Sequence, residues 1–119
     1  MNTLAVDVQP SPTDAAVAVF RLKGHLDAQT VRDLESRFDE QVQAARVRWI
    51  VDLTSLEYIS SAGLGSFVGV LSELRSQSGD ILFTGLSPKM EKIFKVLGFT
   101  RIFRVFASEQ EAVQAYKAL

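Results

Sequence analysis

The sequence predicts an α/β domain with a mixed, mostly parallel sheet. Apolar residues alternate with a period of two near the N-terminus, and further along, helical apolar stripes alternate with short apolar runs. Strands that alternate with helices form mostly parallel sheets with helices packed on their faces. A chain of 119 residues suits one domain. We therefore expect a single domain over residues 1–119 with elements in the order ββαβαβαβα.

The first part of the chain predicts a β-hairpin followed by a helix. Leu4–Val8 alternates apolar with smaller or polar residues, and a turn rich in Pro and Ser separates it from a second strand. That strand covers Ala16–Lys23, and we expect it to end at Gly24. Apolar residues over 31–45 then have the spacing of an amphipathic helix. Aspartate is common at N-cap positions, so we expect Asp27 to cap this helix.

The rest of the chain predicts alternating strands and helices. Trp49–Leu53 is a short apolar run, typical of a central strand buried on both faces, and we expect a short loop after it. Ser87 and Pro88 form a cap and first-turn pair, and Ser108 with Glu111 forms a capping box. The apolar patterns place further strands over 81–83 and 102–106, and the apolar residues of three further helices fall within 64–74, 90–97 and 113–119.

Composition and charge exclude several classes of protein. The chain has 13 basic and 14 acidic side chains, whereas nucleic-acid-binding domains usually carry a basic face, so we expect no direct nucleic-acid partner. It has no cysteine, which excludes a disulfide scaffold, a Cys-ligated zinc ion and a thiol nucleophile. Neither a signal peptide nor an apolar run of roughly 20 residues is present, so we expect a cytoplasmic protein with no membrane partner.

The segment after the central strand contains the candidate functional residues. Ser60 and Ser61 open a helix that contains Gly63 and Gly65. Backbone N–H groups at a helix start lack partners and the helix dipole is positive there, so an anion is stabilised. Serine at a helix start is also often only an N-cap, and both interpretations stay open. The two glycines weaken a helix, but they would keep its first turn flat for the approach of another protein.

Two stretches of the sequence resemble the STAS-domain family, and specifically the bacterial anti-sigma factor antagonists. Gly24-His25-Leu26-Asp27 is similar to the Gly-Glu-Leu-Asp turn after the second strand of that family. Asp52-Leu53-Thr54 through Tyr58–Gly65 resembles its phosphorylation segment, usually Asp-Ser-Ser/Thr-Gly-Leu-Gly with the phosphate on the serine after the aspartate. Ser60 stands in place of that aspartate. The resemblance covers nearly the whole chain and implies a STAS-type single domain.

The resemblance implies a role in partner switching. The unphosphorylated protein would bind an anti-sigma factor that is itself a serine kinase, and this binding would release the sigma factor. Phosphorylation by that kinase would break the complex. A serine phosphatase would then remove the phosphate and restore binding. The implied phosphorylation site is Ser61, with Ser60 as the alternative acceptor. Asp27 is either part of the partner surface or only a cap. We expect a monomer or weak dimer whose partner surface comprises Asp27, Ser60, Ser61, Ala62, Gly63, Leu64 and Gly65.

Two other classes of function compete with this interpretation. An enzyme is disfavoured, because Ile59 stands where a nucleophile elbow needs glycine and the only histidine, His25, precedes the serines. The chain lacks the glycine motifs of nucleotide-binding sites. It has one histidine and no cysteine, which argues against a metal site. We therefore expect no catalytic residues and no cofactor. The other class is a STAS accessory subunit of a lipid-transport ABC system or of a stress-sensing assembly, which would need no phosphorylated serine.

Overall fold

The secondary-structure elements follow the predicted order in a computed structural model that describes residues 2–118. The strands form a five-stranded sheet in the order β1-β2-β3-β4-β5. β1 and β2 pair antiparallel as the predicted hairpin, and the other neighbours are parallel. The predicted α/β class and mixed sheet are therefore confirmed. In chain order the elements are β1 (Leu4–Ser11), β2 (Asp14–Leu26), α1 (Val31–Gln43), β3 (Arg48–Ile59), α2 (Ser61–Ser76), β4 (Asp80–Thr84), α3 (Pro88–Val96), the 3-10 helix η1 (Phe99–Arg101), β5 (Arg104–Phe106) and α4 (Glu109–Lys117).

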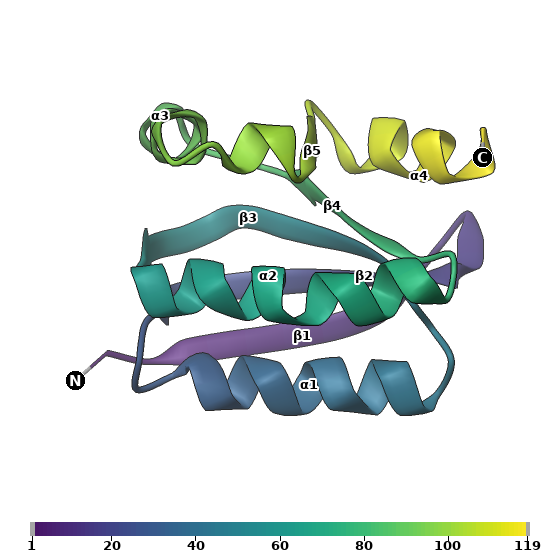
Figure 1. Cartoon of the computed structure of the whole chain (residues 1–119), viewed down its shortest axis with the longest axis horizontal. Coiled ribbons are helices and arrows are strands. Elements are labelled where there is room, and N and C mark those ends of the chain that lie inside the picture. The colour runs from purple at the N-terminus through teal and green to yellow at the C-terminus, as the bar shows by residue number, and fades with distance from the viewer. Residues whose placement is uncertain (1, 119) are drawn as a thin grey trace.

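The helices cover the two faces of the sheet unequally (Figure 1). α1, α2 and α3 pack over one face, where the apolar core includes Phe38, Phe67 and Phe94. α4 packs on the opposite face over a smaller cluster that contains Ile50 and Tyr116. Because α1 and α2 each follow a strand of the parallel part of the sheet, the turn before α1 and the start of α2 lie at the same sheet edge.

The central strand is longer than predicted. β3 runs over Arg48–Ile59 instead of Trp49–Leu53, and the expected loop before the serines is absent because the strand leads directly into α2. The second half of β3 keeps Leu56 and Ile59 buried, while the polar side chains at 54, 55 and 57 are exposed. Those polar residues are the reason why the sequence pattern is typical of a loop.

β2 and β5 also differ from their predicted lengths. β2 continues past Gly24 to Leu26, and Gly24 adopts a φ of 102° inside the strand. A Cβ atom at this position would lie 2.3 Å from the carbonyl oxygen of Thr3, so only glycine fits there. At the other end of the chain, the N–H groups of Ile102 and Phe103 donate to the carbonyl oxygen of Phe99 in η1, so β5 covers only Arg104–Phe106 instead of the predicted 102–106.

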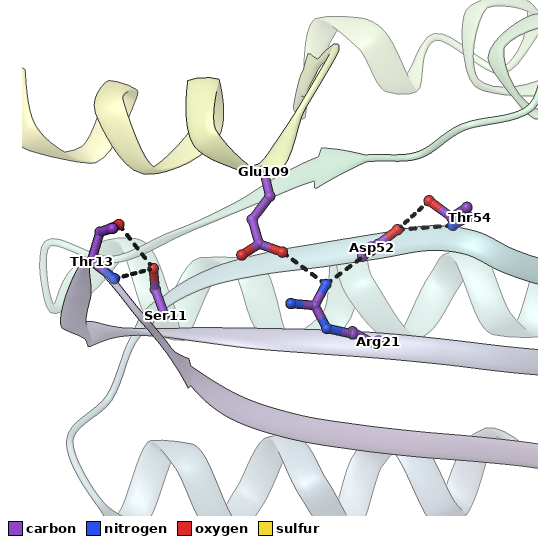
Figure 2. Close-up of polar contacts among 6 residues, drawn as sticks. All are labelled: Ser11, Thr13, Arg21, Asp52, Thr54 and Glu109. Atoms are coloured by element: carbon purple, nitrogen blue, oxygen red, sulfur yellow. Dashed lines mark hydrogen bonds and ion pairs between the residues drawn. The ribbon is translucent and has the colours of Figure 1, made fainter.

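A polar cluster ties α4 to the sheet (Figure 2). Arg21 Nη1 on β2 lies 3.0 Å from Asp52 Oδ2 on β3 and 2.7 Å from Glu109 Oε1 on α4. Asp52 Oδ1 accepts hydrogen bonds from the backbone N–H of Thr54 at 2.9 Å and from its hydroxyl at 2.6 Å. The hydrogen bond to Glu109 raises the pKa of Arg21. The Arg21 side chain is 44% exposed, so each ion pair contributes only about 0–1 kcal/mol.

The starts of α3 and α4 are capped by serines, as predicted. Ser87 Oγ accepts a hydrogen bond from the N–H of Met90 at 3.2 Å, and Ser108 Oγ accepts one from the N–H of Glu111 at 3.1 Å. The Glu111 carboxylate accepts from the N–H of Ala107, one residue before the expected position. Within residues 2–118, none of the helices is long and apolar enough to cross a membrane.

Candidate functional site

The ends of β2 and β3 bring together the two sequence stretches that carry the family resemblance. Leu26 and Ile59 are register partners at the last positions of these two strands. Asp27 and Ser60 follow them directly in the chain, and the backbone N–H of Ser60 donates a hydrogen bond to the carbonyl oxygen of Leu26 at 2.9 Å. The turn before α1 (residues 27–30) and the start of α2 (residues 60–65) therefore form one continuous edge of the molecule, which we call the serine edge.

Ser60 is the N-cap of α2. Its backbone is extended, with φ −93° and ψ 171°, and its Oγ accepts a hydrogen bond from the N–H of Gly63 at 3.3 Å. Its carbonyl oxygen accepts the first helical hydrogen bond, from the N–H of Leu64 at 3.0 Å. The Ser60 hydroxyl is therefore engaged in starting the helix, which is the capping role that the sequence left open.

Ser61 is the first residue of α2 and is exposed. Within the described residues, its hydroxyl makes no hydrogen bond, and the backbone N–H groups of Ser61 and Ala62 have no acceptor. The first turn of α2 carries no acidic side chain. An anion attached to Ser61 would thus lie near two free N–H groups and the positive end of the helix dipole.

The next three residues of α2 differ in what they contribute to the site. A Cβ atom on Gly63 would lie 2.7 Å from Cγ of Leu26 and 3.1 Å from its carbonyl oxygen, whereas a Cβ atom on Gly65 would meet nothing within 4 Å. Gly63 and Leu64 are buried, and Gly65 is exposed together with Ser61 and Ala62. Gly63 therefore allows α2 to approach β2, and only Gly65 keeps the outer surface flat.

Asp27 does not cap α1, so this prediction was wrong. The N-cap of α1 is Thr30, which makes no side-chain cap hydrogen bond. The Asp27 carboxylate instead accepts hydrogen bonds from the N–H groups of Gln29 at 2.9 Å and Thr30 at 3.1 Å, closing the turn that precedes the helix. Desolvation raises the pKa of Asp27, but these hydrogen bonds outweigh it, so its pKa lies below the ordinary aspartate value.

A group of side chains beside this edge was missed by the sequence patterns. His25 Nε2 lies 3.2 Å from Glu57 Oε2, and the ring centroids of His25 and Tyr58 are 5.9 Å apart. Tyr58 is 49% exposed at the end of β3. If the strand is predicted to reach residue 59, the alternation of Tyr58 with the apolar Ile59 identifies Tyr58 as an outward-facing side chain. Within residues 2–118, no three His, Asp or Glu side chains gather closely enough to hold a metal ion.

Comparison with known proteins shows which family this arrangement represents. The sequence profile described as STAS domain matches residues 7–112. BtrV of Bordetella bronchiseptica, whose name marks it as a candidate anti-sigma factor antagonist, is 34% identical over 96 residues. That match covers 81% of this chain and 83% of BtrV.

Solved structures show the same fold. An anti-sigma factor antagonist from Mycobacterium paratuberculosis superposes with a TM-score of 0.84 at 19% identity, covering 97% of this chain and 95% of that one. The phosphorylated form of the Bacillus cell fate determinant SpoIIAA superposes with a TM-score of 0.71 at 26% identity, covering 93% of this chain and 98% of that one. The family profile spans both stretches that meet at the serine edge. The chain therefore belongs to the STAS domain family.

Proposed function

We propose that this protein is an anti-sigma factor antagonist whose binding to an anti-sigma factor serine kinase is switched off by phosphorylation of Ser61. The similarity to BtrV and to SpoIIAA supports the class of function. The observation that favours Ser61 as the phosphorylated residue is the contrast between two adjacent serines. Ser60 caps α2 through its hydroxyl, whereas Ser61 is exposed and its hydroxyl is unengaged within the described chain.

The outer face of α2 suits a protein partner. Ser61, Gly65, Val68 and Ser72 are exposed, and their spacing places them along one side of the helix. This stripe is uncharged, and Val68, 41% exposed, provides an apolar contact near its middle. Asp27 lies at the same edge of the molecule as Ser61. A partner would therefore meet a smooth, neutral helix face with one carboxylate beside it.

The proposed switch moves a phosphoryl group from ATP to Ser61. The Ser61 Oγ would form the new bond to the γ-phosphorus while the bond between that phosphorus and the β,γ-bridging oxygen of ATP breaks, so ADP leaves and the hydroxyl proton passes to a base of the kinase. The phosphate adds about −1.5 to −2 charges at neutral pH. The free N–H groups of Ser61 and Ala62 tolerate this charge, so the fold stays intact, but a docked partner would bury the charge next to Asp27. A loss of about 2.8 kcal/mol in binding free energy corresponds to a hundredfold weaker complex.

The proposal includes no catalytic activity in this chain. Its one histidine, His25, pairs with Glu57 and with neither serine. Within residues 2–118, no side chain that could act as a general base contacts the Ser61 hydroxyl. The kinase activity would therefore belong to the anti-sigma factor, and the removal of the phosphate would require a separate serine phosphatase.

The test is phosphorylation by the anti-sigma factor of the same organism in the presence of ATP. Fragment mass spectrometry should locate the phosphate on Ser61, and Ser61→Ala should abolish it while still binding the partner. Ser60→Ala is the matched control, which should still accept the phosphate. Ser61→Asp should fold normally and bind more weakly than the original protein.

Three results would contradict the proposal. A phosphate on Ser60 with Ser61 unmodified would overturn the choice of residue. If neither serine is modified and Ser61→Asp binds the partner as tightly as the original protein, the switch mechanism fails. Isolation with a membrane-transport ATPase instead of a serine kinase would favour the accessory-subunit function.

A further inference from the structure

A groove with an acidic rim runs between α1 and α2, which lie side by side (Figure 1). It encloses about 460 Å³, and the small residues Ala62, Gly65, Ser66 and Gly69 form most of its floor on α2. A Cβ atom added to either glycine of that floor, Gly65 or Gly69, would meet nothing within 4 Å. Glu35 and Asp39 line it from α1 and Glu73 from α2, with no basic side chain among the lining residues. Within residues 2–118, none of these three carboxylates is in an ion pair.

The outer face of α3 has the opposite character. Met90 and Phe94 bury one side of this helix in the core. Lys89, Lys92 and Val96 are spaced by three and four residues, so they form a stripe away from the buried side, and all three are exposed. Val96 is 75% exposed, the largest value among the exposed large apolar residues of the described chain. The two lysines form no ion pair within that part of the chain.

These two surfaces cannot meet within one molecule. α1, α2 and α3 connect successive pairs of neighbouring strands, so α2 lies between the other two helices (Figure 1). All three helices are fixed by buried side chains on the same sheet face. The contrast in charge is also strong along the chain: residues 88–106 hold five of the 13 basic side chains and only one, Glu91, of the 14 acidic ones.

We propose that the α3 face of one copy of this chain docks into the α1–α2 groove of a second copy. Lys89 and Lys92 would pair with the carboxylates of the groove, and the Val96 side chain would fill the space above the glycines. Opposite charges fix the orientation of such a contact and speed its formation. The contact is head-to-tail. In a pair, one copy therefore keeps a free groove and the other keeps a free α3 face, and further copies can add until the assembly closes into a ring or continues as a chain.

This self-association would regulate access to the serine edge. The groove is lined by Ala62 and Gly65, the neighbours of Ser61 on α2. A docked α3 would therefore compete with an anti-sigma factor for the same part of the helix. That consequence rests on the proposed function, whereas the self-association depends only on the two surfaces and is measured on this protein alone.

The experiment uses charge reversal on each surface and then mixes the variants. One variant carries Glu35→Lys and Glu73→Lys in the groove, and the other carries Lys89→Glu and Lys92→Glu on α3. Each variant alone presents like charges at the contact and should sediment as a monomer of 13.2 kDa. In the mixture every groove again finds an oppositely charged helix face, so association should return. The control variant, Lys23→Glu with Lys117→Glu, makes the same change in net charge as the α3 variant but at exposed sites elsewhere, and should associate like the original protein.

Salt provides the second readout. Sedimentation velocity should give a mean mass above 13.2 kDa that rises with protein concentration at low salt. The value should return to that of the monomer in roughly 1 M salt, where the Debye length is about 3 Å. The inference is overturned if the original protein is monomeric at low salt at every concentration. It is equally overturned if either variant alone associates like the original, or if the mixture stays monomeric.

Discussion

Ser60 and Ser61 are adjacent in the chain but differ in what their hydroxyl groups do. The Ser60 oxygen satisfies the N–H of Gly63, which would otherwise lack a partner at the start of α2. The Ser61 oxygen has no such task within the described chain and faces outward. Modification of Ser60 would disturb the helix start, whereas modification of Ser61 leaves it in place. The single-residue geometry thus separates a structural serine from a candidate regulatory one.

This separation predicts different effects on stability. Ser60→Ala removes the cap and should lower the free energy of unfolding by about 1 kcal/mol. Ser61→Ala removes an exposed hydroxyl and should change it by less than about 0.5 kcal/mol. Urea denaturation followed by circular dichroism measures both variants under the same conditions. Equal losses for the two substitutions would show that the hydroxyl of Ser60 does not cap α2 in solution.

The pKa of Asp27 predicts how its contribution to stability depends on pH. Because folding lowers this pKa, the stabilisation is present above the unfolded value of about 3.9 and is lost as the pH falls through the folded value. Asp27→Asn should therefore be less stable than the original protein at pH 7, and the difference should shrink as the solution is acidified. Urea midpoints across this pH range test it, with Asp39→Asn as a control that removes a carboxylate with no hydrogen bond in the described chain. A difference that persists unchanged at low pH would exclude the charge as its cause.

At the level of secondary-structure elements, apolar periodicity predicted the order of strands and helices but not every boundary. Trp49–Leu53 is apolar on both faces and was recognised as a strand, whereas the rest of β3 is exposed on one face and lacks that signal. The shift of the α1 cap from Asp27 to Thr30 has a similar origin. A turn of residues 27–30, held by backbone hydrogen bonds, precedes the helix, and aspartate suits such a turn as well as it suits an N-cap.

The surroundings of the two glycines near the start of α2 predict opposite effects of alanine substitution on stability. Gly63→Ala would place a Cβ atom against Leu26 and force α2 away from β2, so it should destabilise the fold, typically by about 1–3 kcal/mol for overpacking. Gly65→Ala meets open space and should stabilise the helix by up to about 1 kcal/mol. Thermal unfolding of the two variants measures the difference. A Gly63→Ala protein as stable as the original would mean that this close approach is relaxed in solution.

At the level of the whole molecule, α4 is separated from the serine edge by the sheet. It covers the face opposite α1, α2 and α3, and its attachments include the apolar contacts of Ala112, Val113 and Tyr116, the hydrogen bonds of the Tyr116 hydroxyl, and the ion pair between Arg21 and Glu109. The sequence predicted α4 and its cap, but periodicity carries no information on which face of a sheet a terminal helix covers. The structure therefore separates a part of the fold that supports stability from the part proposed to bind a partner.

Tyr116 provides a test of that separation. Its hydroxyl lies 2.7 Å from the carbonyl oxygen of Trp49 and 2.8 Å from that of Asp80, and the side chain is buried. Burial and the nearby charge of Asp80 raise the pKa of Tyr116, so the hydroxyl stays protonated and its effect should not vary with pH near neutrality. Tyr116→Phe removes this donor from the carbonyl oxygens of Trp49 and Asp80 and should lower the free energy of unfolding by about 1–3 kcal/mol.

The matched control for Tyr116→Phe is Tyr58→Phe, which removes the same hydroxyl from a side chain that is 49% exposed and should have little effect on stability. Urea denaturation compares the two variants, and calorimetry measures binding of the Tyr116→Phe protein to the anti-sigma factor. Because α4 and α2 pack against opposite faces of the sheet, we expect the affinity to stay unchanged while stability falls. A marked loss of affinity in a protein that is still folded at the assay temperature would show instead that α4 is energetically coupled to the serine edge through the central strands.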